Sequence, residues 1–266
     1  MTARLHPAAW IAWATCAGLV VFTTTNPFYL GPVAAAAWFV YATCRVDGPG
    51  ARAFRTFAIG GLVAMTLRTA LVFLGTVDAS SVLYAALEGA RLAALLVVFG
   101  TFNAVTDPSA VVRLAPRRFH EPALAASLAL SIAPRTIASA ARVREAQQLR
   151  GIHIPRWRSL PALAVPVLET GMEDAVTLAE SMDARGHGRG RRTRYRPDPW
   201  TFSAVLIAAA AAVAAGLFVA AAWTGHAGLH PATSPLAWPP VDLALVAAIC
   251  LLTVPGLVPV RSGEAP

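Results

Sequence analysis

The sequence predicts an all-α integral membrane protein with five to six transmembrane helices and a cytoplasmic pair of amphipathic helices. Hydrophobic residues make up 56% of the 266 residues and charged residues only 14%, outside the usual range of soluble domains. The apolar residues gather in long runs. The chain has no lysine, and 15 of its 22 arginines lie between Asp107 and Pro199. These observations divide the chain into residues 1–106 with four spans, a cytoplasmic domain at 107–199, and residues 200–266 with two further spans.

Four spans are expected in the first part of the chain, at about residues 8–24, 28–44, 56–77 and 82–105. The first is short, and Arg4 before it is also typical of a secretory signal peptide. A second span follows at once and no good cleavage site is evident, so a transmembrane helix is favoured. Trp38 and Tyr41, near the end of the second span, are typical of an interfacial aromatic belt.

Three charged residues interrupt these spans: Arg68 in the third, and Glu88 and Arg91 in the fourth. A charge at bilayer depth costs at least about 2.5 kcal/mol unless it is paired or hydrated. Glu88 and Arg91 are three residues apart and lie on one helix face. Arg68, in the adjacent helix, is expected to pair with Glu88 as well. We favour an interhelical polar clasp. A substrate or proton path is the alternative, although such sites more often have broken helices and more polar groups.

The cytoplasmic domain is expected to begin with a helix capped by Asp107 or Thr106, with Pro108 in its first turn. Two amphipathic helices follow, at about 122–150 and 160–185, each roughly 35–40 Å long. Pro134 is expected to bend or break the first of them. Neither helix is expected to be apolar enough to span a bilayer.

The C-terminal part predicts a fifth span at 201–223 and a sixth run at 241–260, in which Pro255 and Pro259 are expected to limit the span. With the N-terminus in the cytoplasm, every arginine outside a span falls on the cytoplasmic side. The sequence therefore predicts a multi-pass protein of the cell inner (plasma) membrane with a cytoplasmic N-terminus.

Two similar segments stand out in the cytoplasmic domain, Arg144–Gly151 and Glu180–Gly186. Each predicts a helix that carries carboxylates, ends on an arginine and is stopped by a glycine. A single copy is readily explained as an ordinary helix C-terminus. Two copies on successive helices favour a docking role, because the guanidinium forms bidentate bonds with partner carboxylates.

No pattern of catalytic or metal-binding residues accompanies these segments. The sequence contains no Walker motif and no catalytic signature of the Gly-x-Ser-x-Gly or His-Glu-x-x-His type. Cys16, Cys44 and Cys250 are scattered through apolar runs and form no Cys-x-x-Cys pair. We therefore expect a non-catalytic subunit without a cofactor or a bound metal.

The run Glu180–Thr193 resembles the second signature of the transmembrane component of energy-coupling factor (ECF) transporters, the EcfT/CbiQ-like family. Arg144–Gly151 resembles the first signature. Thr106-Asp107-Pro108 and Ala133-Pro134-Arg135 are also similar to that family. The resemblance covers residues 91–196, and the flanking spans match only in general character.

This resemblance implies that the chain couples ATP hydrolysis in two cytoplasmic ABC-type ATPase subunits to a membrane-embedded substrate-binding S component. The cargo would be a vitamin or a transition metal such as cobalt or nickel, and no nucleic acid would be bound. The implied ATPase-docking residues are Leu149, Arg150, Gly151, Ala184, Arg185 and Gly186. Leu149 departs from the family pattern, in which alanine is common.

Two other functions are open to the sequence. A membrane-anchored adaptor would bind anionic lipid or nucleic acid through the arginine-rich segment Arg185–Arg196. An integral-membrane enzyme would use Arg68, Glu88 and Arg91, although no catalytic constellation accompanies them.

Overall fold

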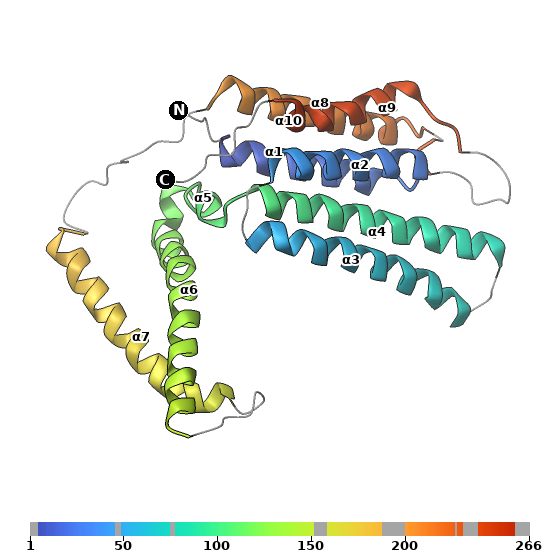
Figure 1. Cartoon of the computed structure of the whole chain (residues 1–266). Coiled ribbons are helices and arrows are strands. Elements are labelled where there is room, and N and C mark those ends of the chain that lie inside the picture. The colour runs from blue at the N-terminus through green and yellow to red at the C-terminus, as the bar shows by residue number, and fades with distance from the viewer. Residues whose placement is uncertain are drawn as a thin grey trace. The chain divides into compact units, whose positions relative to one another are not determined.

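The computed structural model describes residues 5–45, 49–74, 78–151, 159–187, 200–226, 228–230 and 239–258. Within these ranges all regular secondary structure is helical, and several helices are long and apolar, so the expected all-α membrane fold is confirmed (Figure 1). The chain forms two compact units, one of residues 1–114 with 198–266 and one of residues 115–197. We describe each unit separately.

The first unit contains the following helices before its last apolar run. They are α1 (Pro7–Thr23), α2 (Pro27–Cys44), α3 (Pro49–Ala70), α4 (Ala79–Val105), α5 (Pro108–Val112) and α8 (Phe202–Trp223). Polar side chains fix several helix starts: Asn26 accepts from the N–H of Phe28 at 3.0 Å, and Asp107 accepts from that of Ser109 at 3.0 Å. A proline occupies the first position of both helices, where its missing N–H costs nothing. The predicted cap at Asp107 is confirmed.

The helices of the first unit pack in the order α3, α4, then α1 and α2, then α8 (Figure 1). α3 and α4 approach most closely, through glycines. A Cβ atom on Gly89 would lie 2.8 Å from the Cα of Met65, and one on Gly61 would lie 3.0 Å from the Cα of Ala93. Small residues allow two transmembrane backbones to approach in this way.

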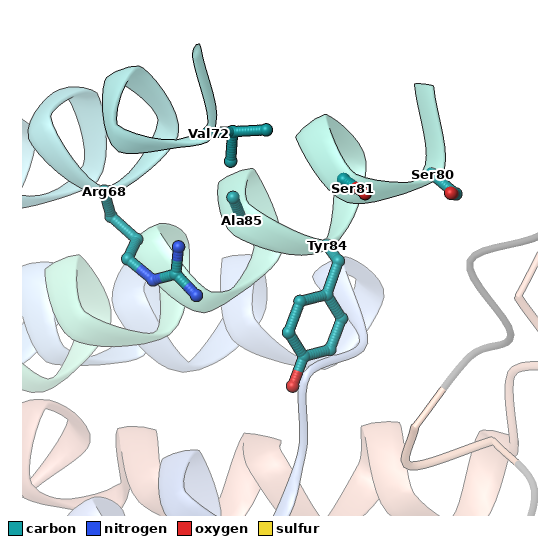
Figure 2. A pocket seen from close by; sticks show the side chains of 6 residues that line it. All are labelled: Arg68, Val72, Ser80, Ser81, Tyr84 and Ala85. Carbon is teal, nitrogen blue, oxygen red and sulfur yellow. The ribbon is translucent and has the colours of Figure 1, made fainter. Parts of the chain in front are cut away.

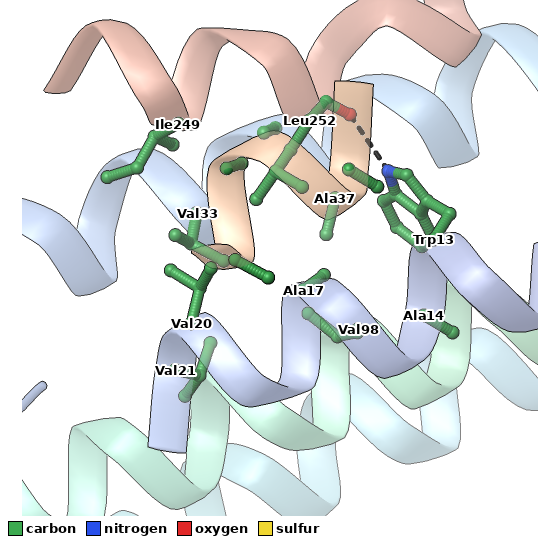
Figure 3. Packing of buried hydrophobic residues seen from close by; sticks show 14 of the residues in the cluster. Trp13, Ala14, Ala17, Val20, Val21, Val33, Ala37, Val98, Ile249 and Leu252 are labelled. Carbon is green, nitrogen blue, oxygen red and sulfur yellow. Dashed lines mark hydrogen bonds between the residues drawn. The ribbon is translucent and has the colours of Figure 1, made fainter. Parts of the chain in front are cut away.

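The core of the first unit lies where α1, α2, α4 and α8 meet the C-terminal helices. Val20, Val40, Val98 and Phe218 have no exposed surface there. Trp13 is 1% exposed, and its indole N–H donates to the carbonyl of Leu252 at 2.9 Å (Figure 3). This bond satisfies a buried polar group and holds the C-terminal segment against α1.

The turn between α1 and α2 is tied to the connection that follows α8. The side-chain amide of Asn26 donates to the carbonyls of Gly228 at 2.7 Å and Pro240 at 3.1 Å. The hydroxyl of Thr24 donates to the carbonyl of Leu229 at 2.9 Å. Thr24 and Asn26 have no exposed surface, so this is a buried polar network.

The last apolar run differs from a full span. It consists of α9 (Leu243–Cys250), the 3-10 turn η3 (Leu251–Thr253) and α10 (Val254–Leu257).

The third helix begins earlier than the predicted residue 56, at Pro49. Proline is favoured in the first turn of a helix, so Pro49 starts α3 and is not part of the loop before it. It continues as the 3-10 turn η1 (Leu71–Leu74).

The second unit consists of the short turn η2 (Arg117–Phe119), α6 (His120–Leu149) and α7 (Ser159–Ala184), and the two helices contact each other. Pro134 was expected to bend or break this helix, and it does not break it, because α6 continues through that residue. A proline removes one backbone hydrogen bond, and the turns on either side retain their own.

The hydropathy of the helices corrects one further prediction. Four helical segments of the described residues are long and apolar enough to cross a membrane: Gly50–Leu74, Ala79–Val105, Glu121–Leu149 and Phe202–Trp223. Pro7–Thr23 and Leu243–Leu257 are apolar but shorter. By length and composition, the expectation that the helix at Glu121–Leu149 is too polar to span was wrong. Its first 18 or so residues after Glu121 contain only one charge, Arg135, and the polar residues gather near its C-terminus.

Candidate docking site

Both helices of the second unit end in an arginine that is followed by a glycine in the left-handed conformation. Arg150 is the C-cap of α6, and Gly151 follows it with a φ of 79°. At the end of α7, Gly186 follows Arg185 with a φ of 77°. A residue with a Cβ is strained at such a φ, so glycine is required for the chain to leave the helix in this direction.

Backbone hydrogen bonds close each helix end. At α7 the N–H of Gly186 donates to the carbonyl of Asp183 at 2.8 Å, and that of His187 donates to Met182 at 3.0 Å. This pair of bonds is a Schellman motif. At α6 the N–H of Gly151 donates to Gln148 at 3.0 Å. The terminal carbonyls are thus satisfied by the backbone, and the arginine side chains are not needed for this purpose.

The side chains at both ends are exposed. Arg150 and Arg185 are exposed, and Leu149 beside Arg150 is 85% exposed. Among the described residues, neither arginine makes an ion pair. Both guanidinium groups can therefore form bidentate bonds with carboxylates of another chain.

The two arginines lie at opposite ends of the helix pair. α6 ends at Leu149 and α7 begins at Ser159, so the start of α7 lies near Arg150, and Arg185 follows the far end of α7 (Figure 1). α7 has 26 residues, which corresponds to a length of about 39 Å. A single narrow groove cannot hold two groups this far apart. Two separate grooves are required if both arginines dock.

A third helix shows that the cap alone is not specific. At the end of α8, Gly225 has a φ of 67°, its N–H donates to Ala222 at 3.3 Å, and that of His226 donates to Ala221 at 3.0 Å. This is the same motif with Thr224 in place of arginine. The cap therefore accounts for the glycines, and the exposed arginines are what distinguish α6 and α7.

The charged residues of the spans form two separate sites. Glu88 and Arg91 make an ion pair with 3.6 Å between Oε1 of Glu88 and a terminal nitrogen of Arg91. Arg91 also donates to the carbonyl of Phe22 near the end of α1, and its guanidinium lies 4.5 Å from the centroid of the Phe22 ring. Arg68 instead lines a cavity together with Tyr84, and it makes no ion pair with any of the described residues.

The pairing of Glu88 with Arg91 was expected from their spacing, whereas the contact of Arg91 with Phe22 was missed at the level of sequence. Phe22 is 69 residues from Arg91, and a backbone carbonyl leaves no mark in the residue pattern. The run Arg185–Arg196 continues beyond residue 187 into residues that lie outside the described ranges. In the described part of the chain, no three His, Cys, Asp or Glu side chains are grouped so that they could hold a metal ion.

Apolar helices and a second unit of two arginine-ended helices define a multi-pass membrane protein. A family model described as CbiQ, cobalt transport protein, matches residues 1–195. The chain therefore belongs to the CbiQ/EcfT-like family of ECF transporter transmembrane components.

Two curated relatives carry the name energy-coupling factor transporter transmembrane protein EcfT. The protein from Exiguobacterium sibiricum is 34% identical over 89 residues, which is 31% of this chain and 34% of the relative. The protein from Listeria innocua serovar 6a is 31% identical over 112 residues, 40% of this chain and 42% of the relative. The matched regions thus span between a third and about two fifths of these relatives.

Proposed function

We propose that this chain is the non-catalytic coupling subunit of an ECF-type importer. Two cytoplasmic ATPase subunits bind the ends of α6 and α7, and a separate membrane-embedded S component binds the cargo, a vitamin or a transition metal such as cobalt. The proposal rests mainly on the repeated helix end: an exposed arginine, a left-handed glycine and a backbone that needs no further cap. Family membership and the names of the relatives support it.

Each helix end presents the same chemistry to its partner. The guanidinium of Arg150 or Arg185 binds a carboxylate in an ATPase groove. The glycine that follows turns the chain away so that the helix end can enter that groove. Leu149 and Ala184 precede the arginines and contact the groove wall. The exposure of Leu149 supports this contact, because an apolar side chain at a helix tip gains by burial in a partner.

ATP binding and hydrolysis in the partners move the two grooves relative to each other. Because Arg150 and Arg185 lie at opposite ends of the α6–α7 pair, such a motion changes the angle between the helices. Rigid helices transmit this change as levers, and the attached membrane part reorients the S component. With the N-terminus in the cytoplasm, the arginine-rich domain lies on the same side as ATP. Reporter fusions at both membrane faces test that orientation.

Reversing the charge at both helix ends tests the docking role. We expect Arg150→Glu with Arg185→Glu to reduce co-purification of the ATPase subunits and cargo uptake by at least about tenfold, since two charge-assisted bonds are replaced by repulsion. Arg118→Glu is the matched control, because Arg118 is also exposed in the second unit but does not follow a long helix. Unchanged ATPase association in the double variant would refute the proposal.

A further inference from the structure

An open cavity of about 340 Å³ lies between the end of α3 and the first turns of α4. It is lined by Arg68, Val72, Ser80, Ser81, Tyr84 and Ala85 (Figure 2). Four of these six side chains can donate hydrogen bonds, although the two helices are otherwise apolar and cross the membrane by length and composition. The cavity is separate from the helix ends of the proposed docking site.

Arg68 is the only cation that lines the cavity, and it has no anionic partner among the described residues. It lies in the apolar segment Gly50–Leu74 and is half-buried. The nearby carboxylate of Glu88 is already paired with Arg91. A charge in this position is costly unless a counter-ion or the interface is within reach. Arg68 is therefore available to a negative group from outside the chain.

The remaining polar groups supply further donors for such a negative group. No described residue forms a hydrogen bond with the hydroxyls of Ser81 or Tyr84. The hydroxyl of Ser80 donates to the carboxylate of Asp78 and is not available. The cavity thus offers one guanidinium and two free hydroxyls, a set of donors that matches the oxygens of a phosphate group.

Asp78 limits the charge of the ligand. Asp78, at the start of α4, is an ionised carboxylate at neutral pH, and the hydrogen bond from Ser80 holds its pKa below the ordinary value. Arg68 balances one negative charge of a ligand, and the second charge of a doubly charged anion would have no cation among the lining residues and would be repelled by Asp78. A phosphodiester carries one negative charge, whereas a phosphate monoester or inorganic phosphate is mostly doubly charged at pH 7. The site therefore favours a phosphodiester.

The surroundings of the cavity are suited to acyl chains. Leu67, Leu71 and Leu83 are 59%, 51% and 45% exposed on the same ends of α3 and α4. Arg68 lies six residues before Leu74, the end of η1, or roughly 9 Å at helical rise. An arginine at this depth can direct its head toward the headgroup region while its stem stays in the apolar layer.

We propose that this cavity is a binding site for the phosphodiester of a membrane phospholipid. The guanidinium of Arg68 and the hydroxyls of Ser81 and Tyr84 bind its non-bridging oxygens, and the exposed leucines contact its acyl chains. In the orientation proposed above, the lipid belongs to the leaflet that faces away from the cytoplasm. Only the choice of leaflet depends on that orientation, and the site itself does not depend on the docking function.

Native mass spectrometry of the purified full-length chain, titrated with phosphatidylglycerol or phosphatidylethanolamine, tests this site. We expect Arg68→Gln to lower the affinity for the most tightly bound lipid by about tenfold or more. We expect Ser81→Ala with Tyr84→Phe to lower this affinity as well. Arg55→Gln is the matched control, since it removes an exposed arginine from the other end of α3. Equal lipid affinity in the wild type and in Arg68→Gln would overturn the proposal.

A second arm separates a lipid from free phosphate. Inorganic phosphate is added at the same concentrations at which the lipid saturates its site. It is expected neither to displace the lipid nor to raise the thermal stability of the chain. Displacement by inorganic phosphate would overturn the assignment to a lipid. ATPase co-purification is expected to be unchanged in Arg68→Gln, so that failure here and failure of the docking proposal are distinguishable.

Discussion

Arg91 closes the end of α1 within the membrane. α1 has 17 residues and a length of about 25 Å, which is less than the roughly 30 Å of a bilayer core. Its last carbonyls therefore lie where no water is available to bind them. Arg91 donates to the carbonyl of Phe22, stacks on its ring and is neutralised by Glu88. A polar residue of α4 thus binds a backbone carbonyl at the end of the neighbouring helix α1.

This role predicts an asymmetric double-mutant cycle. Arg91→Met is expected to lower the free energy of unfolding by about 2–4 kcal/mol, because it leaves the carboxylate of Glu88 unpaired and the carbonyl of Phe22 unbonded. Glu88→Met with Arg91→Met is expected to recover part of this loss. Unfolding in mixed micelles measures both. If the loss of unfolding free energy in the double variant equals the sum of the losses in the two single variants, the pairing of Glu88 with Arg91 is contradicted.

The glycines that follow Arg150 and Arg185 predict a local effect of substitution. A Cβ atom on Gly186 would meet no other atom within 4 Å, so Gly186→Ala costs only the backbone strain of a left-handed residue, about 1–2 kcal/mol. We expect faster amide hydrogen exchange in the last turn of α7. Gly171→Ala, in the open middle of the same helix, is expected to slow exchange, since alanine favours helix. Equal exchange in both variants would argue against a strained cap.

At the scale of elements, α3 is positioned by its contact with α4. The backbones meet at Gly61 and Gly89, and the outer face of α3 is left to lipid: Ile59, Leu62 and Leu67 are all more than half exposed. Near its start α3 also contacts α2, where the rings of Tyr41 and Phe54 stack with their centroids 3.7 Å apart, and the rest of its length depends mainly on α4.

A methyl group at this interface tests its tightness. Gly89→Ala is expected to destabilise the chain by about 1–3 kcal/mol, because the new Cβ would lie 2.8 Å from the Met65 backbone, which cannot move aside as a side chain can. Gly60→Ala is the control: its Cβ would meet nothing within 4 Å, and it is expected to be neutral or slightly stabilising. Thermal unfolding of the two variants gives the comparison, and equal melting temperatures would exclude close packing.

The elements themselves follow well from the sequence, because long apolar runs and polar caps such as Asp107 and Thr201 act locally. What the sequence could not supply was contact between distant residues. Arg68 and Glu88 are both charges within spans, and pairing them was a reasonable expectation. The structure pairs Glu88 with its neighbour Arg91, and the register of α3 on α4 places Arg68 at the cavity that Tyr84 also lines.

The helix ends at Arg150 and Arg185 were also accessible to sequence reasoning, since glycine after a helix has a local cause. Hydropathy averaged over each helix was less informative. α6 combines an apolar first part with a polar end, and only its position in an assembled complex decides which part meets lipid. The docking role of the two arginines likewise stays a prediction until a partner is bound.

At the scale of the whole first unit, the buried network around Asn26 joins the first helices to the last. Asn26 accepts from the N–H of Phe28 and donates to Gly228 and Pro240, which are more than 200 residues away. These bonds hold the α1–α2 turn against the connection after α8. The N-terminal and C-terminal spans therefore form one body.

Asn26→Ala is expected to lower the free energy of unfolding by about 2–3 kcal/mol, because it removes a helix cap and leaves two carbonyls without their donor. Limited proteolysis between α8 and α9 is expected to accelerate in parallel. Asn103→Ala is the matched control, since Asn103 is exposed on α4. Equal proteolysis of the two variants would contradict a tie between the ends of the chain.

The exposure of Leu149 has a consequence for the steady-state amount of this protein in a cell. Leu149 is 85% exposed, and α7 adds Val165, Met172 and Val176, each more than half exposed. Under the proposed function, newly made chains that bind no ATPase present this apolar surface to chaperones and proteases, which remove such species. The steady-state amount of the subunit is then set by the supply of its partners, so that subunit stoichiometry is corrected after synthesis by degradation of the excess.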